Sequence, residues 1–263
     1  MSGMTKHRLI VFSDLDGCLL NKHDYQWQDA RQCLLELRDR GVPLILASSK
    51  TVAEIEAIAA EIPCVNSPFI SENGGAICWR SLATAGDPEI QCAGVPRSEI
   101  LDLLAKLKSQ FQFRSFRDLG LSGVMESTSL DAEKATAAMM RQSTEPLLWD
   151  DSENQRTEFE QILQQHKLTL TKGGRFWHVA GKISKGDALR KVVERYRNPG
   201  AVVAAIGDSQ IDQSMLDAAN VPIGIRVNGI LSVNVSCPPG IVPQSEGARG
   251  WAEAVTELLR NFE

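Results

Sequence analysis

The sequence lacks the features that mark membrane, secreted or nucleic-acid-binding proteins. No apolar run approaches the ~20 residues that a membrane-spanning helix needs, and the start has no long apolar signal segment. Basic residues are not in excess: 28 Lys and Arg against 33 Asp and Glu give a formal charge of −5. Because nucleic-acid and anionic-membrane binders usually carry a basic surface, we expect neither partner. We expect a cytoplasmic protein, and nothing indicates an obligate protein partner.

Cysteine is sparse and scattered. The sequence has six cysteines with no Cys-x-x-Cys pair and no histidine at zinc-finger spacing. This pattern disfavours a disulfide scaffold and a structural zinc site, and cytosolic thiols stay reduced. We predict free thiols at Cys18, Cys33, Cys64, Cys78, Cys92 and Cys237.

What is present is the pattern of an α/β protein. The 263 residues, 43% of them hydrophobic, can form one large or two modest domains. Short apolar runs at residues 9–12 and 42–47 enclose a helical pattern at 27–40, and the alternation resumes with a helix over 184–196 and a strand at 201–206. Continuously apolar strands alternating with helices predict a doubly wound, mainly parallel, Rossmann-like core.

The pattern changes from residue 96 onward. Amphipathic helices alternate with shorter strands, which predicts an inserted α+β domain over residues 96–182 and a core domain made of 1–95 and 183–263. We expect the aromatic residues of this segment to form its core rather than a sugar-stacking surface. The predicted helices cover residues 98–109, 131–142 and 155–166, and the predicted strands lie near 111–116, 168–171 and 175–179.

Two aspartates directly follow the first predicted strand. Because side chains alternate along an extended chain, Asp14 and Asp16 can project to the same side of the strand end. Two carboxylates at one site repel each other unless a cation accompanies them, and their oxygens suit Mg²⁺. An aspartate-rich turn before Gly17 is the alternative for this segment taken alone.

A second carboxylate pair follows the predicted strand at 201–206. Asp208 stands at the strand end and Asp212 in the first turn of the next helix, so both can face the crevice at the carboxyl ends of the strands. Helix capping alone would also explain Asp212, whereas Asp208 is harder to explain as a cap.

Candidate phosphate-binding residues follow two other elements. Ser48 ends the second strand, where its hydroxyl and the amides of the next helix can hold a phosphate. Lys185 follows the expected cap Ser184, a position where a cation is unfavourable unless an anion lies nearby. Taken singly, Ser48 is also a default cap and Lys185 also fits a solvated lysine.

Together these segments resemble the four motifs of haloacid-dehalogenase-like phosphatases in order and spacing. The inserted segment resembles the branch with an α/β cap between the second and third motifs. Four further phrases resemble the mannosyl-3-phosphoglycerate phosphatases within that branch. They are Ser-Ser-Lys-Thr from Ser48, Glu-Asn-Gly-Gly from Glu72, Glu-Pro-Leu-Leu-Trp from Glu145 and Gly-Gly-Arg-Phe-Trp-His from Gly173.

The resemblance implies hydrolysis of a phosphomonoester. Asp14 would be the nucleophile that forms an aspartyl-phosphate, and Asp16 the acid that protonates the leaving oxygen and then the base that activates water. Ser48 and Lys185 would bind phosphoryl oxygens. Mg²⁺ would be the cofactor, held by Asp14, the carbonyl of Asp16 and Asp208, with Asp212 assisting.

The resemblance also implies residues that contact the rest of the substrate. Arg175 follows two glycines, and its guanidinium suits the carboxylate of a glycerate group. His178 and Arg141 would also contact substrate. The alternative for His178 is packing in the cap core, and the alternative for Arg141 is a favourable charge at a helix C-terminus. The full implied set is Ser49, Asn73, Gly74, Arg141, Gly174, Arg175 and His178.

The implied substrate is a phosphorylated glycosyl-glycerate, first of all the mannosyl compound, whose product would serve as a compatible solute. The glucosyl compound, a broader set of sugar phosphates, a phosphomutase and a non-catalytic sugar-phosphate sensor are the alternatives. The fourth motif departs from the family at Ile211, where asparagine is usual. This predicts that metal or phosphate is less well ordered, at a site that remains catalytically active.

Overall fold

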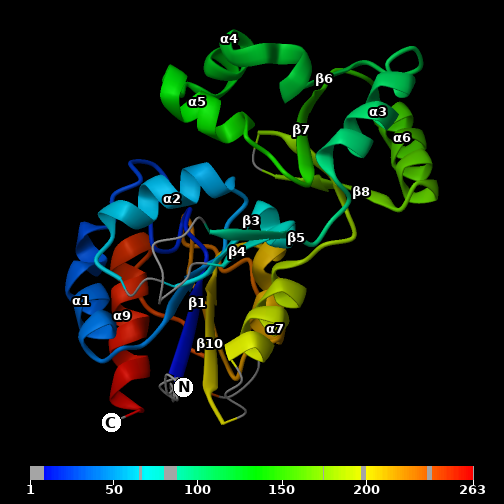
Figure 1. Ribbon diagram of the computed structural model, residues 1–263. Helices are drawn as coiled ribbons and strands as arrows, with labels where there is room; N and C mark the ends of the chain where they lie inside the picture. The colour runs from blue at the N-terminus through cyan, green and yellow to red at the C-terminus, as the bar shows by residue number, and fades with distance from the viewer. Residues whose placement is uncertain are drawn as a thin grey trace.

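The computed structural model describes residues 9–64, 67–79, 88–173, 175–196, 200–235 and 239–262. It shows an α/β core with a smaller α+β cap above one end (Figure 1). The predicted fold class is confirmed. Among the described residues no helix is both long and apolar enough to cross a membrane, and no disulfide joins the described cysteines. Cys237 lies outside them.

A four-stranded parallel sheet forms the centre of the core, in the order β11-β10-β1-β2. Its strands are continuously apolar and buried, as expected of a sheet covered on both faces. The strand β11 was not predicted from the sequence, because it has only four residues and contains Pro222. The strands are β1 (Leu9–Ser13), β2 (Leu44–Leu46), β10 (Val202–Gly207) and β11 (Val221–Gly224).

An antiparallel sheet extends the core beside β2. A bridge between Ala47 and Ile70 joins the two sheets, and β4 and β5 form an antiparallel pair with Trp79 opposite Glu89. The strands are β3 (Phe69–Ser71), β4 (Ala76–Trp79) and β5 (Glu89–Cys92).

Helices cover both faces of the parallel sheet (Figure 1). Along β1, Leu9 and Val11 pack in one buried cluster and Ile10 and Phe12 in the other, so the strand contributes alternate side chains to two cores. The first cluster includes α1 (Arg31–Asp39), α2 (Val52–Glu61) and α9 (Gly247–Arg260), and the second includes α7 (Lys185–Tyr196) and α8 (Gln213–Asp217).

The cap is an antiparallel sheet, ordered β6-β7-β9-β8, with helices packed around it. The sequence did not predict α4 or β7: Gly120, at φ 60°, interrupts the apolar pattern of α4, and Pro146 lies inside β7. The cap elements are α3 (Arg97–Leu107), β6 (Phe113–Ser115), α4 (Phe116–Thr128), α5 (Ala132–Met139), β7 (Thr144–Trp149), α6 (Glu153–Gln165), β8 (Leu168–Lys172) and β9 (Trp177–Gly181).

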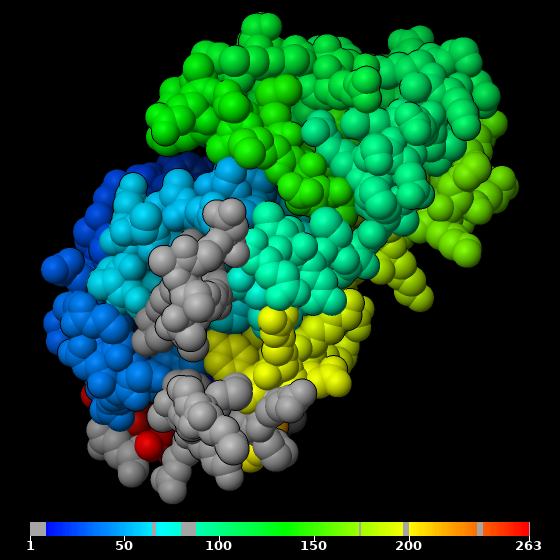
Figure 2. Space-filling view, in the orientation of Figure 1, coloured from blue at the N-terminus to red at the C-terminus, as the bar shows by residue number. Residues whose placement is uncertain are grey.

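The cap aromatics pack against one another. Phe111 and Phe113 are buried, with ring centroids 5.3 and 5.4 Å from that of Phe159. Phe116 meets Phe176 edge to face at 5.0 Å. Most of the cap's apolar surface therefore forms its own core, as the sequence predicted. In the space-filling view the cap lies against one end of the core (Figure 2).

Candidate active site

The first aspartate lies at the carboxyl end of β1. The Asp14 amide donates to the carbonyl of Ile206 at 2.9 Å, which continues the pairing of β1 with β10. Ser13 Oγ donates to the Asp14 carbonyl at 2.7 Å and accepts from Trp251 Nε1 at 2.9 Å. The backbone around Asp14 is thus fixed from two sides, and the residue is only 7% exposed.

Lys185 meets Asp14 from the start of α7. Its ammonium donates to Asp14 Oδ1 at 2.6 Å and to Asp212 Oδ1 at 2.5 Å, and the side chain is buried. Burial lowers the pKa of Lys185, but the attraction of the two carboxylates outweighs burial and raises it overall. The carboxylates of Asp14 and Asp212 explain why a lysine stands near the N-terminus of a helix, where a cation alone is unfavourable.

Asp212 joins the loop after β10 to this ion-pair cluster. Its Oδ2 accepts from the amides of Asp208 at 3.2 Å and Ser209 at 3.0 Å, and from Ser209 Oγ at 2.8 Å. Burial raises the pKa of Asp212, but Lys185 and the hydrogen bonds outweigh it and the pKa is lowered. Protein donors therefore engage both carboxylate oxygens of Asp212, which orients the Asp208 loop.

Two carboxylates and a thiol come together beside this ion-pair cluster. One ligand atom each from Asp14, Asp208 and Cys18 lie within 4.8 Å of one another. Burial, followed by the repulsion of nearby carboxylates, raises the pKa of Asp208, and burial raises that of Asp14 despite the attraction of Lys185. Asp16 Oδ1 is buried without a hydrogen-bond partner. Hard carboxylate oxygens of this kind fit Mg²⁺.

The other oxygen of Asp16 pairs with a residue that sequence reasoning missed. Lys50 Nζ lies 2.8 Å from Asp16 Oδ2, and its own amide donates to Ser48 Oγ at 3.3 Å. Lys50 follows Ser48 and Ser49 at the end of β2, so its position in the phosphate-binding phrase was the available signal. The contact ties the second aspartate to the loop that the sequence singled out.

The loops after β2 and β3 hold each other. Ser48 is buried, and its carbonyl accepts from the amide of Asn73 at 2.9 Å. Asn73 has φ 57° within the short helix η2 (Glu72–Gly74). Gly74, at φ 104°, packs so closely on the start of α7 that any Cβ there would collide with the Ser184 carbonyl. The absence of a side chain at Gly74 therefore lets these loops lie close to Lys185.

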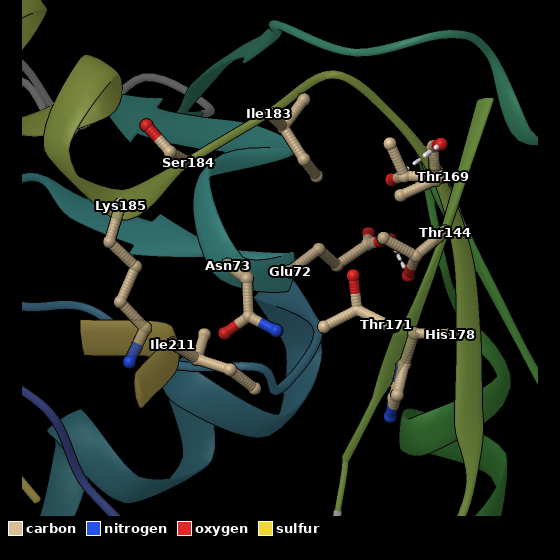
Figure 3. A pocket seen from close by; sticks show the side chains of 11 residues that line it. Glu72, Asn73, Thr144, Thr169, Thr171, His178, Ile183, Ser184, Lys185 and Ile211 are labelled. Carbon is tan, nitrogen blue, oxygen red and sulfur yellow. Dashed lines mark hydrogen bonds between the residues drawn. The ribbon is translucent and has the colours of Figure 1, made fainter. Parts of the chain in front are cut away.

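A cavity of about 160 Å³ opens beside this cluster, between core and cap (Figure 3). Asn73, Ile211 and Lys185 project into it from the core, whereas the cap side presents threonine hydroxyls and an imidazole. Sequence reasoning missed the threonines. The remaining lining comes from Glu72, Thr144, Thr169, Thr171, His178, Ala180, Ile183 and Ser184.

His178 is the titratable cap residue of this wall. Burial, followed by repulsion from Arg141, lowers its pKa to about 3, so the imidazole is neutral at ordinary pH. Its ring lies against the backbone of Gly173, where a Cβ would stand 2.8 Å from Nε2. His178 is therefore half-buried and also lines the cavity, which combines the two alternatives of the sequence analysis.

The two predicted cap arginines lie in different surroundings. Arg141 is half-buried at the junction, where Nη1 donates to the Ser49 carbonyl at 3.3 Å and to Thr144 Oγ1 at 2.9 Å. Arg175 is exposed and donates to the carbonyl of Ser127, and it is not among the residues that line the cavity. Gly174 lies outside the described residues.

Comparison with known sequences gives a family. The model of the haloacid dehalogenase-like hydrolases matches residues 11–228. Two curated relatives are named glucosyl-3-phosphoglycerate/mannosyl-3-phosphoglycerate phosphatase. The protein from Persephonella marina is 33% identical over 97% of this chain and 98% of its own, and that from Methanococcoides burtonii is 32% identical over 95% and 97%.

Solved structures share the whole fold at low identity. A protein of Thermoplasma acidophilum aligns with a TM-score of 0.68 at 15% identity, covering 97% of this chain and 98% of its own. A haloacid dehalogenase-like hydrolase from Bacteroides thetaiotaomicron gives 0.66 at 19%, covering 97% and 99%. With its four motifs gathered at one edge of the sheet, the chain belongs to the haloacid dehalogenase-like hydrolase family.

Proposed function

We propose that this phosphatase hydrolyses mannosyl-3-phosphoglycerate to mannosylglycerate and phosphate. The observation that carries the proposal is the buried Asp14–Lys185–Asp212 cluster at one end of a cavity whose other wall carries hydroxyls. The cluster suits a phosphoryl group, and the hydroxyl-bearing wall suits a sugar. The names of the two curated relatives support this substrate class and also make the glucosyl compound a second candidate.

In the proposed mechanism the Asp14 carboxylate attacks the phosphorus atom. The bond from phosphorus to the substrate's bridging oxygen breaks, and Asp16 gives that oxygen its proton, which releases the glycosylglycerate. Asp16 then accepts a proton from water as the water oxygen attacks the aspartyl-phosphate, which releases phosphate and restores Asp14. Lys50 holds the Asp16 carboxyl beside this path.

Lys185 supplies the fixed positive charge of the proposed site. It already contacts Asp14, so it offsets the repulsion between that carboxylate and an incoming phosphate dianion. Ser48 and the neighbouring amides would hold phosphoryl oxygens. Mg²⁺, held by Asp14, Asp208 and the carbonyl of Asp16 with Asp212 fixing the loop, would supply further positive charge against the phosphoryl oxygens.

We propose that the cap recognises the rest of the substrate. Thr171 offers a hydroxyl to the sugar and His178 a neutral imidazole. The hydroxyls of Thr144 and Thr169 shape the same wall but already donate to Glu72 and to the Ala180 carbonyl. For the glycerate carboxylate, Arg141 is better placed than Arg175, because it contacts the cavity residue Thr144 at 2.9 Å while Arg175 donates to the Ser127 carbonyl. Arg175 remains the alternative carboxylate contact.

Phosphate release by the purified protein tests this function. Mannosyl-3-phosphoglycerate, its glucosyl analogue and p-nitrophenyl phosphate are compared with Mg²⁺ and with EDTA, beside Asp14→Asn. We expect preference for a glycosyl compound, loss with EDTA and loss in the variant. Equal weak rates on all three would overturn the substrate, and phosphate returned to the sugar rather than to water would indicate a mutase. Binding without turnover would indicate a sensor.

Alanine variants test whether Arg141 or Arg175 contacts the glycerate carboxylate. Arg141→Ala should raise the Michaelis constant for the carboxylated substrate much more than for p-nitrophenyl phosphate. If Arg175→Ala does so instead, the glycerate lies on the other side of the cap. A metal-dependent rise in melting temperature, measured without substrate, checks Mg²⁺ binding independently of turnover.

A further inference from the structure

One buried carboxylate outside the reacting groups spans the junction of core and cap. Glu72 follows β3 in the core, is fully buried, and has φ 51°. Its side chain crosses to the cap, where Oε1 accepts from the amide of Gln142 at 2.6 Å. Its Oε2 accepts from the amide of Ser143 at 3.2 Å and from Thr144 Oγ1 at 2.5 Å.

The three donors are consecutive residues: Gln142 and Ser143 immediately precede β7, and Thr144 is its first residue. The contact is reinforced by Ser143 Oγ, which donates to the Gly75 carbonyl at 2.7 Å. Figure 3 shows Glu72 extending from the core ribbon to Thr144 on the cap strand. One core side chain therefore holds the backbone of the cap segment that forms part of the cavity wall.

The contact continues to the phosphate-binding loop through Arg141. Thr144 Oγ1 gives its single hydrogen to Glu72, which leaves its lone pairs to accept from Arg141 Nη1 at 2.9 Å. The same Nη1 reaches the carbonyl of Ser49, and the Glu72 amide donates to the Lys50 carbonyl at 2.9 Å. Glu72 thus fixes Arg141 relative to the loop that carries Ser48.

We propose that Glu72 is a positioning residue that locks the cap in register with the phosphate-binding loop. It touches no reacting atom; it acts through Thr144 and the two cap amides. The geometry requires a carboxylate. In Glu72→Gln one oxygen becomes an NH₂ group, so in either orientation at least one cap donor faces another donor.

The inference rests on the proposed function only for its choice of substrates. In Glu72→Gln we expect kcat/KM for mannosyl-3-phosphoglycerate to fall at least about tenfold, since hydrogen bonds to a charged group are lost. Turnover of p-nitrophenyl phosphate, which makes no contact with a sugar wall, should change less than about twofold. Thr144→Val keeps both amide bonds and should give a smaller loss in the same direction.

A second buried glutamate provides the matched control. Glu145 is also fully buried, but its partners, Arg97 Nε at 2.6 Å and the Arg117 amide at 2.9 Å, lie within the cap. Glu145→Gln should reduce melting temperature without separating the two substrates. If it separates them as strongly as Glu72→Gln does, or if Glu72→Gln lowers both rates equally, the positioning role is wrong.

Hydrogen exchange tests the lock without any substrate. In Glu72→Gln the amides of Gln142 and Ser143 should exchange at least about tenfold faster than in the wild type, whereas Glu145→Gln should instead free the Arg117 amide. Unchanged exchange at residues 142 and 143 would overturn the lock. Faster exchange combined with no hydrolysis of glycosyl compounds by the wild type would keep the lock and reject the proposed substrate.

Discussion

The two walls of the cavity differ in how they handle charge. On the core side, Asp14 and Asp212 share the ammonium of Lys185. Burial raises the pKa of Asp14, whereas the ion pairs outweigh burial to raise the pKa of Lys185 and lower that of Asp212. On the cap side the wall consists of threonine hydroxyls and a neutral His178. A charged wall can bind and activate a phosphate, whereas a neutral wall can select among substrates by hydrogen bonding. Reaction and selectivity should therefore be separable by mutation.

The largest effect is expected on the core side. Asp14→Asn keeps the shape of the side chain but removes the nucleophile, so turnover should fall at least about 10³-fold. The fall should be the same for glycosylated and simple phosphomonoesters, because every substrate needs the aspartyl-phosphate. Phosphate release measures it, with circular dichroism to check folding. A variant that keeps a tenth of the activity would remove Asp14 from this role.

A cap-side change should lower selectivity and spare the chemistry. Thr171→Val deletes one hydroxyl of the cavity wall at nearly constant volume, and kcat/KM for the glycosyl compound should fall about five- to tenfold. The rate on p-nitrophenyl phosphate should stay within about twofold. Thr157→Val, on the exposed face of α6, is the matched control. Equal losses on both substrates would show that the two walls do not act separately.

Ile211 is an apolar residue beside the polar groups of the core wall. It projects into the cavity near Lys185 and Asn73 (Figure 3). Ile211→Asn places an amide there. We expect the Mg²⁺ concentration for half-maximal activity, or the Michaelis constant of the phosphate substrate, to fall about two- to fivefold, the effect of about one hydrogen bond. Titration of activity with metal measures it. Unchanged metal dependence and turnover would remove the basis for a weakened fourth motif.

The smallest effect concerns stability rather than rate. The pKa of His178 falls from 6.5 to about 3 on folding. Between these values the unfolded chain binds a proton that the folded chain does not, so the free energy of unfolding falls as pH falls. In His178→Gln this fall should shrink by at least about 1 kcal/mol between pH 7 and pH 4. If urea unfolding shows that the wild type and His178→Gln lose the same free energy of unfolding between pH 7 and pH 4, the burial of the imidazole is contradicted.

The core wall followed from the sequence because parallel strands end at one edge. Asp14, Ser48 and Asp208 each come directly after a predicted strand, and β1, β2 and β10 prove to be adjacent in one parallel sheet. Lys185 and Asp212 followed from their places in the first turn of a helix. Local order along the chain was enough, since the topology then brings these ends together.

The cap wall did not follow, because it depends on strand register. Thr144 and Thr169 both lie opposite Ala180, and Thr171 lies opposite His178, so these side chains share one face only once β7, β8 and β9 are aligned. A shift by one residue would turn the whole set to the other face. The role of Glu72 depends on tertiary packing in the same way, because its partners are 70 or more residues away.

The hydrogen bond from Trp251 to Ser13 has a consequence for the order of folding during synthesis. It joins residues 238 positions apart, and β1 finds its partner β10 with Leu9 opposite Val202. The cap sheet, by contrast, pairs only residues between 113 and 181. On a ribosome the cap can therefore complete its sheet before β10 and α9, which complete the surroundings of Asp14, have been synthesised.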